Sequence, residues 1–138
     1  MGQYFYIVNI SKKEYLDGNC AGTGLKFLEQ YNTMTLLRYL IRQSTEGGGG
    51  DIDYEGKYCG RWAGDRITMV GDYDESHLFE KARNKFINIT HGVLDEWNNV
   101  AEGDDKVERV FTCEHMTEQE EEEHWRQYHA KYSKGVKA

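Results

Sequence analysis

Hydrophobic residues near the start of the chain form a nearly continuous run. Residues 3–10, with the sequence QYFYIVNI, are rich in aromatic and β-branched side chains. Such an unbroken run is typical of a strand that is covered on both faces. The polar turn Ser11-Lys12-Lys13 and the short run Glu14-Tyr15-Leu16 come next. The pattern therefore predicts a central strand and an opening β-hairpin.

Three later segments have the spacing of amphipathic helices, in which apolar residues recur every three or four positions. Thr33 is the expected N-cap of the first helix, Ser76 caps the second, and the third begins at Thr90 and ends before Gly103. Their apolar stripes are Leu36, Leu37, Leu40 and Ile41; Leu78, Phe79, Ala82 and Phe86; and Val93, Leu94, Trp97, Val100 and Ala101.

Two further strands and a last helix complete the expected elements. Residues 66–70 predict one strand, and the alternation of Val107, Phe111 and Cys113 predicts another. Thr117 and Glu120 form a capping-box pattern ahead of a helix with an aromatic stripe that includes Trp125. Between the first helix and residue 60, the four glycines at 47–50 indicate a flexible connection.

The order of these elements predicts an α+β fold. Strands and helices are interspersed, but the chain opens with a hairpin, so we expect a small mixed or antiparallel sheet with helices mainly on one face. Its length of 138 residues is that of one domain. We expect a single globular domain over residues 1–133 and a frayed tail over residues 134–138.

Charge and composition narrow the functional classes. The chain has 24 acidic and 17 basic residues and a formal net charge of −7, a balance that disfavours general binding to nucleic acid. It contains no apolar run of membrane-spanning length and no recognisable leader, so we expect a cytoplasmic protein without a membrane interaction. Three widely spaced cysteines fit reduced thiols better than a disulfide framework. The acidic run 120–123 is interpreted as a solvated first helical turn.

The densest group of chemically suggestive residues is the segment 60–66. Two glycines permit close backbone approach, two guanidiniums supply forked donors and an indole offers a stacking face, a combination that suits an anionic or nucleotide-like ligand. The alternative is structural: Asp65 pairs with a neighbouring arginine while Trp62 fills the core beside a tight turn. The candidate ligand-binding residues are Gly60, Arg61, Trp62, Gly64, Asp65 and Arg66.

Metal and catalytic motifs are incomplete. Residues 51–56 copy the start of a calcium loop, but Trp62 stands where the bidentate glutamate belongs. The five histidines form no HExxH motif, and Cys59 beside the arginine-rich loop is more readily explained as a small buried residue than as a nucleophile. We therefore expect no metal and no cofactor, and no catalytic residue is assigned.

Two segments resemble a known family. The opening Met1-Gly2-Gln3-Tyr4-Phe5-Tyr6-Ile7-Val8-Asn9 and the element Trp62-Ala63-Gly64-Asp65-Arg66 are similar to an uncharacterised family of small bacterial, phage and microbial-eukaryote proteins that begin MGQYY and carry a WAGDR element. The resemblance covers about the first 75 residues. It implies no activity, substrate or cofactor, and it favours a functional role for residues 60–66.

Three functional hypotheses follow from the sequence. The first is a non-enzymatic binding module, in which Arg61 and Arg66 contact an anionic small molecule and Trp62 stacks on it. The second is a protein-interaction or structural subunit, including a homo-oligomer, which predicts an exposed apolar patch. The third is a metal-dependent nucleotide hydrolase that uses Asp65, Asp72 or Asp74. The sequence leaves the question of an enzyme open and favours a non-enzymatic role.

Overall fold

The computed structural model describes residues 2–44, 56–102 and 126. Within this part of the chain, a four-stranded mixed sheet packs against three helices, so the predicted α+β fold class is confirmed. The elements are β1 (Phe5–Asn9), β2 (Glu14–Leu16), the 3₁₀ turns η1 (Gly18–Ala21) and η2 (Phe27–Glu29), α1 (Tyr31–Leu40), β3 (Ile67–Gly71), α2 (Leu78–Lys85), β4 (Ile87–Asn88) and α3 (Thr90–Glu102).

The first strand lies inside the sheet, as its apolar run predicts. The strand order is β3-β1-β2-β4; β1 is antiparallel to both of its neighbours, and β2 and β4 are parallel. Successive β1 side chains alternate between two separate cores, with Ile7 in one and Tyr6 and Val8 in the other. Because both faces of β1 are covered, apolar residues are needed at nearly every position.

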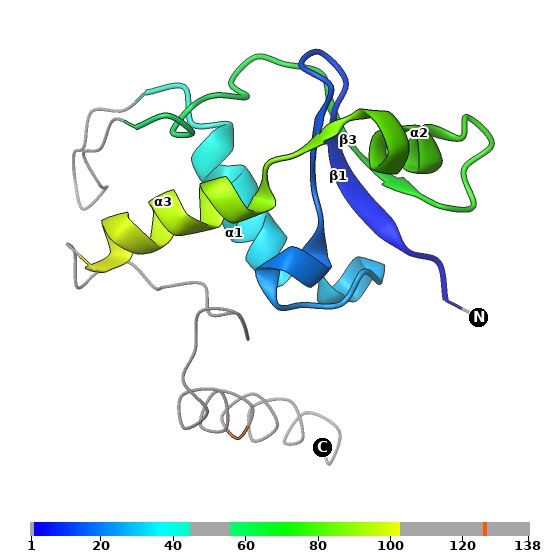
Figure 1. Cartoon of the computed structure of the whole chain (residues 1–138), viewed down its shortest axis with the longest axis horizontal. Helices are drawn as coiled ribbons and strands as arrows, with labels where there is room; N and C mark the ends of the chain where they lie inside the picture. Colours follow the sequence, from blue (N-terminus) through cyan, green and yellow to red (C-terminus); the bar gives the residue numbers. More distant parts are fainter. Residues whose placement is uncertain (1, 45–55, 103–125, 127–138) are drawn as a thin grey trace.

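One face of the sheet is covered by α1 and α3, which lie together on the same side of the strands (Figure 1). Their predicted apolar stripes supply half of the buried residues of this larger core. Leu37 is only partly buried, and Ile41, the C-cap residue of α1, is 45% exposed. The stripe residues that are fully buried are Leu36, Leu40, Val93 and Leu94.

The opposite face is covered by α2. Phe79 stacks on Tyr6 with ring centroids 4.1 Å apart, and Leu78, Ala82 and Phe86 pack in the same cluster. The stripe predicted for this helix is therefore its packing face. Two of the three helices thus share one face, and the third shields the other side of β1.

Local details of the helix starts differ from the predictions. Gln30, not Thr33, is the N-cap residue of α1; Thr33 is buried inside the first turn, where its hydroxyl donates to the Gln30 side-chain oxygen at 2.7 Å. In α2 the N-cap residue is His77, with φ of 59°. The Ser76 hydroxyl still accepts a hydrogen bond from the Leu78 amide at 3.2 Å. Thr33 and Ser76 thus lie next to the helix starts but not at the cap positions.

The strand β4 is absent from the predicted elements. It has two residues and is joined to the hairpin by a hydrogen bond from the Ile87 amide to the Lys13 carbonyl, 3.0 Å long. A two-residue strand carries no periodic signal. The predicted strand at 107–113, the helix after Thr117 with its acidic turn, the end of the domain at 133 and the tail all lie outside the described residues, as do the four glycines at 47–50.

A matched pair of leucine substitutions tests this core. Leu36 is fully buried, whereas Leu28 in η2 is 83% exposed. We expect Leu36→Ala to lower the free energy of unfolding by about 3 kcal/mol because it leaves a cavity. Leu28→Ala should change it by less than about 0.5 kcal/mol. Urea denaturation of the two variants checks this, and equal losses would contradict the described packing.

Candidate functional site

The segment 60–66, which contains the predicted ligand residues, starts in contact with the C-terminal end of α1. The Gly60 amide donates to the Tyr39 carbonyl at 3.0 Å, and the Trp62 amide donates to the Leu40 carbonyl at 2.9 Å. These carbonyls belong to the last turn of the helix, where intrahelical donors are lacking. Gly60 reaches this position with φ of 74°. The loop therefore acts as the C-terminal cap of α1.

Glu14 of β2 holds the same loop through its buried carboxylate. The Trp62 indole N–H donates to Glu14 Oε1 at 2.8 Å, and the Arg61 guanidinium donates through Nε at 3.0 Å and Nη2 at 2.7 Å. Burial alone would raise the pKa of Glu14, but the hydrogen bonds from Arg61 and Trp62 outweigh it and hold this pKa below its usual value. The carboxylate is thus charged and fully engaged by the loop.

A second set of polar contacts joins the end of the loop to the hairpin turn. Asp65 accepts hydrogen bonds from Lys12 Nζ at 2.7 Å and from Asn9 Nδ2 at 2.9 Å. Both donors lower the pKa of Asp65. The Arg66 amide donates to the Ser11 hydroxyl at 3.0 Å. Residues 61–66 are therefore fastened to the β1–β2 hairpin at each end of the segment.

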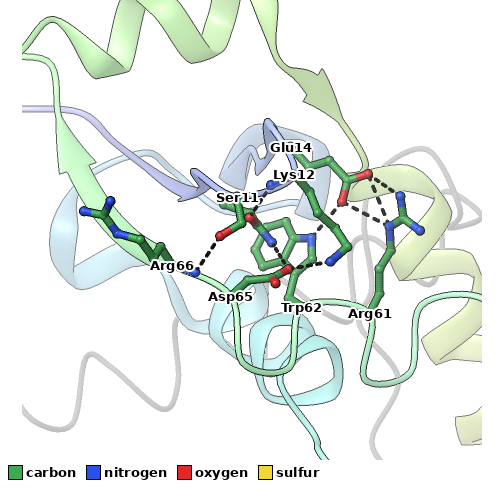
Figure 2. Close-up of polar contacts among 8 residues, drawn as sticks. Ser11, Lys12, Glu14, Arg61, Trp62, Asp65 and Arg66 are labelled. Carbon is green, nitrogen blue, oxygen red and sulfur yellow. Dashed lines mark hydrogen bonds and ion pairs between the residues drawn. The ribbon is translucent and has the colours of Figure 1, made fainter.

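These contacts separate the groups that the ligand-binding prediction placed together. The Trp62 side chain is fully buried in the larger core, so it offers no stacking face to a ligand. Figure 2 shows the Arg61 and Arg66 side chains on opposite sides of the Trp62 ring, and Arg61 is occupied by Glu14. The predicted stacking role of Trp62 does not fit this burial, because the indole is part of the core. The structural alternative fits, with Lys12 in place of an arginine as the partner of Asp65.

Glu96 of α3 anchors the start of the loop, a role that the sequence analysis missed. Its carboxylate accepts hydrogen bonds from the Tyr39 hydroxyl at 2.7 Å and from the amides of Lys57, Tyr58 and Cys59 at 2.8 to 3.2 Å. Cys59 packs against the core. The only sequence signal was an acidic residue directly beside the core residue Trp97, which does not by itself reveal partners 37 residues away.

The predicted hydrolase carboxylates are distributed over both ends of β3. Asp65 precedes this strand and Asp72 follows it, a separation of about 23 Å along an extended chain. Asp72 accepts a hydrogen bond from the Tyr4 amide at 3.0 Å, and Asp74 accepts one from the Ser76 amide at 3.0 Å. Asp65 and Asp72 therefore cannot share one ion. Among the described residues, no three His, Cys, Asp or Glu side chains are placed to bind a metal.

The histidines and the copied calcium loop give no further site within the described part. His77 and His91 are exposed, and the nearest carboxylate oxygen to His77 is Glu80 Oε2 at 3.9 Å. His115, His124 and His129, the segment 51–55 and Cys113 lie outside the described residues. In the described ranges, no helix is long and apolar enough to cross a membrane.

The strand that follows the loop exposes its main chain along one side. The Asp72 amide donates to the Tyr4 carbonyl and the Ile10 amide donates to the Arg66 carbonyl, which fixes the even-numbered residues of β3 as those bonded to β1. In an antiparallel pair the alternate residues point their amides and carbonyls away from the partner strand. The outward residues of β3 are Ile67, Met69 and Gly71. No other strand of the described residues pairs with this side.

A cavity of about 560 Å³ runs along this edge. Its walls include residues 68–71 of β3, and Phe5 and Tyr73 also line it. Phe5 contacts Phe27 edge to face, with ring centroids 5.6 Å apart. Phe27 is 59% exposed and Tyr73 is 61% exposed. We call this area the edge surface: the outward main chain of β3 together with Phe5, Phe27 and Tyr73.

In comparisons with protein-family models, with curated proteins and with solved structures, no match to this chain was found. The resemblance to the family with the WAGDR element therefore stays a prediction.

Two glycine substitutions test the tight fit of the loop. Gly60 and Gly64 both have positive φ, at 74° and 79°. A Cβ at Gly60 would lie 2.6 Å from the Arg42 carbonyl oxygen, whereas one at Gly64 meets nothing within 4 Å. Gly64→Ala should therefore cost about 1 kcal/mol from backbone strain alone. Gly60→Ala should cost at least about 1 kcal/mol more. Thermal or urea unfolding measures both, and equal costs would contradict the close approach to α1.

The Glu14 interaction predicts a specific pH dependence. Because the folded state lowers the pKa of Glu14 below its ordinary value of 4.5, the carboxylate adds stability above that pH and loses it as the pH falls. Glu14→Gln should cost about 2 kcal/mol at pH 7, less than for a fully buried pair because Arg61 is partly exposed. The difference from the wild type should shrink between about pH 6 and pH 3. Urea denaturation at several pH values measures it, and a constant difference would contradict the interpretation.

Proposed function

We propose that this chain is a protein-interaction module, and that the edge surface along β3 binds an extended segment of a protein. The observation that carries the proposal is the row of outward main-chain groups beside a cavity of about 560 Å³: the amides of Ile67, Met69 and Gly71 and the carbonyls of Ile67 and Met69. An extended segment can add to such an edge as a further strand, with main-chain hydrogen bonds providing affinity and neighbouring hollows receiving its side chains.

The apolar groups around the edge support a protein as the ligand. Phe27 and Tyr73 expose most of their rings, and Leu28 beside Phe27 is 83% exposed. Phe5 connects the two sides, since it contacts Phe27 and lines the same cavity as Tyr73. Aromatic side chains are enriched in the cores of protein interfaces. Exposed apolar side chains of the kind expected at an interaction surface thus lie next to outward main-chain donors and acceptors, which supports the proposal.

The contacts of residues 60–66 favour this function over binding of a small anion in the loop. The ligand proposal needs two converging guanidiniums and an accessible indole. Glu14 occupies Arg61 and the core occupies Trp62, which leaves Arg66 as the one exposed cation among the predicted binding residues. Binding of an anionic ligand at this loop stays a prediction, and the loop geometry does not support it.

Selection from a displayed library of random extended peptides tests the proposed function. Peptides selected on the full chain should bind the wild type and lose at least about tenfold in affinity for Met69→Pro, because proline removes one outward amide. This amide is not bonded to β1, so the substitution spares the existing ladder. Met69→Leu is the matched control, since it keeps the amide and a similar side-chain volume. Affinities are measured by fluorescence polarisation.

The location of bound peptide is read from backbone amide chemical shifts. The largest shifts should fall on Ile67, Met69 and Gly71 and on neighbouring residues of the edge surface. Selected peptides that bind the wild type and Met69→Pro equally, or that shift amides elsewhere, would show that this edge is not the binding surface. A library that yields no binder to the full chain would likewise count against the proposal.

A further inference from the structure

We infer that the partner of the edge surface is a second copy of this chain, joined through antiparallel pairing of β3 with the partner's β3. The inference rests on the proposed function and specifies its partner. It is carried by three features of the strand: a self-complementary register, opposite charges at its two ends, and the lack of charged residues and proline within Ile67–Gly71.

The register follows from the positions of the outward groups. Pairing about a two-fold axis at Met69 overlaps the whole strand Ile67–Gly71 with its copy. Met69 then faces the partner's Met69, and Ile67 faces the partner's Gly71. All of these are outward residues, and the Met69 pair can exchange both main-chain hydrogen bonds. The Gly71 carbonyl already accepts from the Asp74 amide at 3.1 Å, so each Ile67–Gly71 pair is joined by the bond from the Gly71 amide to the Ile67 carbonyl. A two-fold contact uses the same patch on both copies, as most homodimer interfaces do.

The same register brings opposite charges together. Arg66 precedes β3 and Asp72 follows it, so pairing about Met69 places Arg66 opposite the partner's Asp72 at both ends of the joint. Within the described residues the exposed Arg66 guanidinium makes no hydrogen bond or ion pair. Asp72 accepts from the Tyr4 amide through Oδ1, and its other oxygen can accept from a guanidinium. Pairs of this kind lie at non-hydrogen-bonded positions, where side chains of neighbouring strands are closest.

The strand lacks the residue types that most often protect sheet edges. Its sequence, Ile-Thr-Met-Val-Gly, contains no lysine, other charge or proline. Exposed edge strands of monomeric proteins are commonly protected by such residues because unpaired main-chain groups otherwise recruit another strand. The aromatic groups of the edge surface flank this unprotected edge, and in the dimer they would be covered.

A charge-exchange experiment with the full chain tests the inference by sedimentation velocity over a concentration series. The wild type should form a dimer. Arg66→Asp and Asp72→Arg should each weaken self-association by at least about tenfold, since each places like charges at both ends of the joint. An equimolar mixture of the two variants should restore the dimer, because every contact is then between opposite charges.

Lys13→Asp is the control for the change in net charge. Lys13 is exposed and lies on the β4 side of the sheet, away from β3, and its φ of 58° suits aspartate. The Lys13→Asp variant should dimerise as strongly as the wild type. Far-ultraviolet circular dichroism of each variant confirms that the fold is intact, and Arg66→Ala provides a milder second variant with a smaller expected loss.

The possible results separate this inference from the proposed function. A monomeric wild type whose edge still binds selected peptides overturns only the inference, because another protein is then the partner. A dimer that neither charge variant weakens, or one that the mixture fails to restore, shows that the copies meet elsewhere and also overturns it. A monomeric chain with no peptide binding at the edge overturns both proposals.

Discussion

The structure depends most on the buried carboxylate of Glu14, which binds the Arg61 guanidinium and the Trp62 indole from a position inside the sheet. A buried carboxylate is tolerated only when its oxygens are well paired. Here the pairing fixes the loop at residues 60–66 against the hairpin and directs Trp62 into the core. Arg61 and Trp62, which look like ligand-binding residues in the sequence, are the residues that pair with this carboxylate.

The loop in turn determines where β3 begins. Glu96 holds residues 57–59, Glu14 holds residues 61–62, and Asp65 joins the end of the loop to Lys12 and Asn9. β3 then starts two residues after Asp65, and among the described strands it pairs with β1 alone. These contacts hold the loop that precedes β3, so they also fix the position of the strand. A fixed position favours binding at its edge, because less ordering is needed when a partner binds.

Local sequence patterns predicted the two strands of the hairpin, β3 and the three described helices, but not β4 or the contacts of the site. The unbroken run around Ile7 showed a strand covered on both faces, and the 3.6-residue spacing around Leu94 and Phe79 showed helix packing faces. The contact between Glu14 and Trp62 spans 48 residues, so no local pattern reports it. Whether β3 is central or at an edge depends on strand order, which the order of elements along the chain does not determine.

Residue-resolved hydrogen exchange tests most directly the central proposal that one side of β3, which no described strand covers, is unpaired in the isolated chain. In dilute full-length protein, the amides of Ile67, Met69 and Gly71 should exchange fast, whereas those of Thr68 and Val70, which face β1, should exchange slowly. This two-residue alternation is the predicted result. Uniformly slow exchange over residues 67–71 in dilute solution would contradict it, because the edge would then be covered within a single chain.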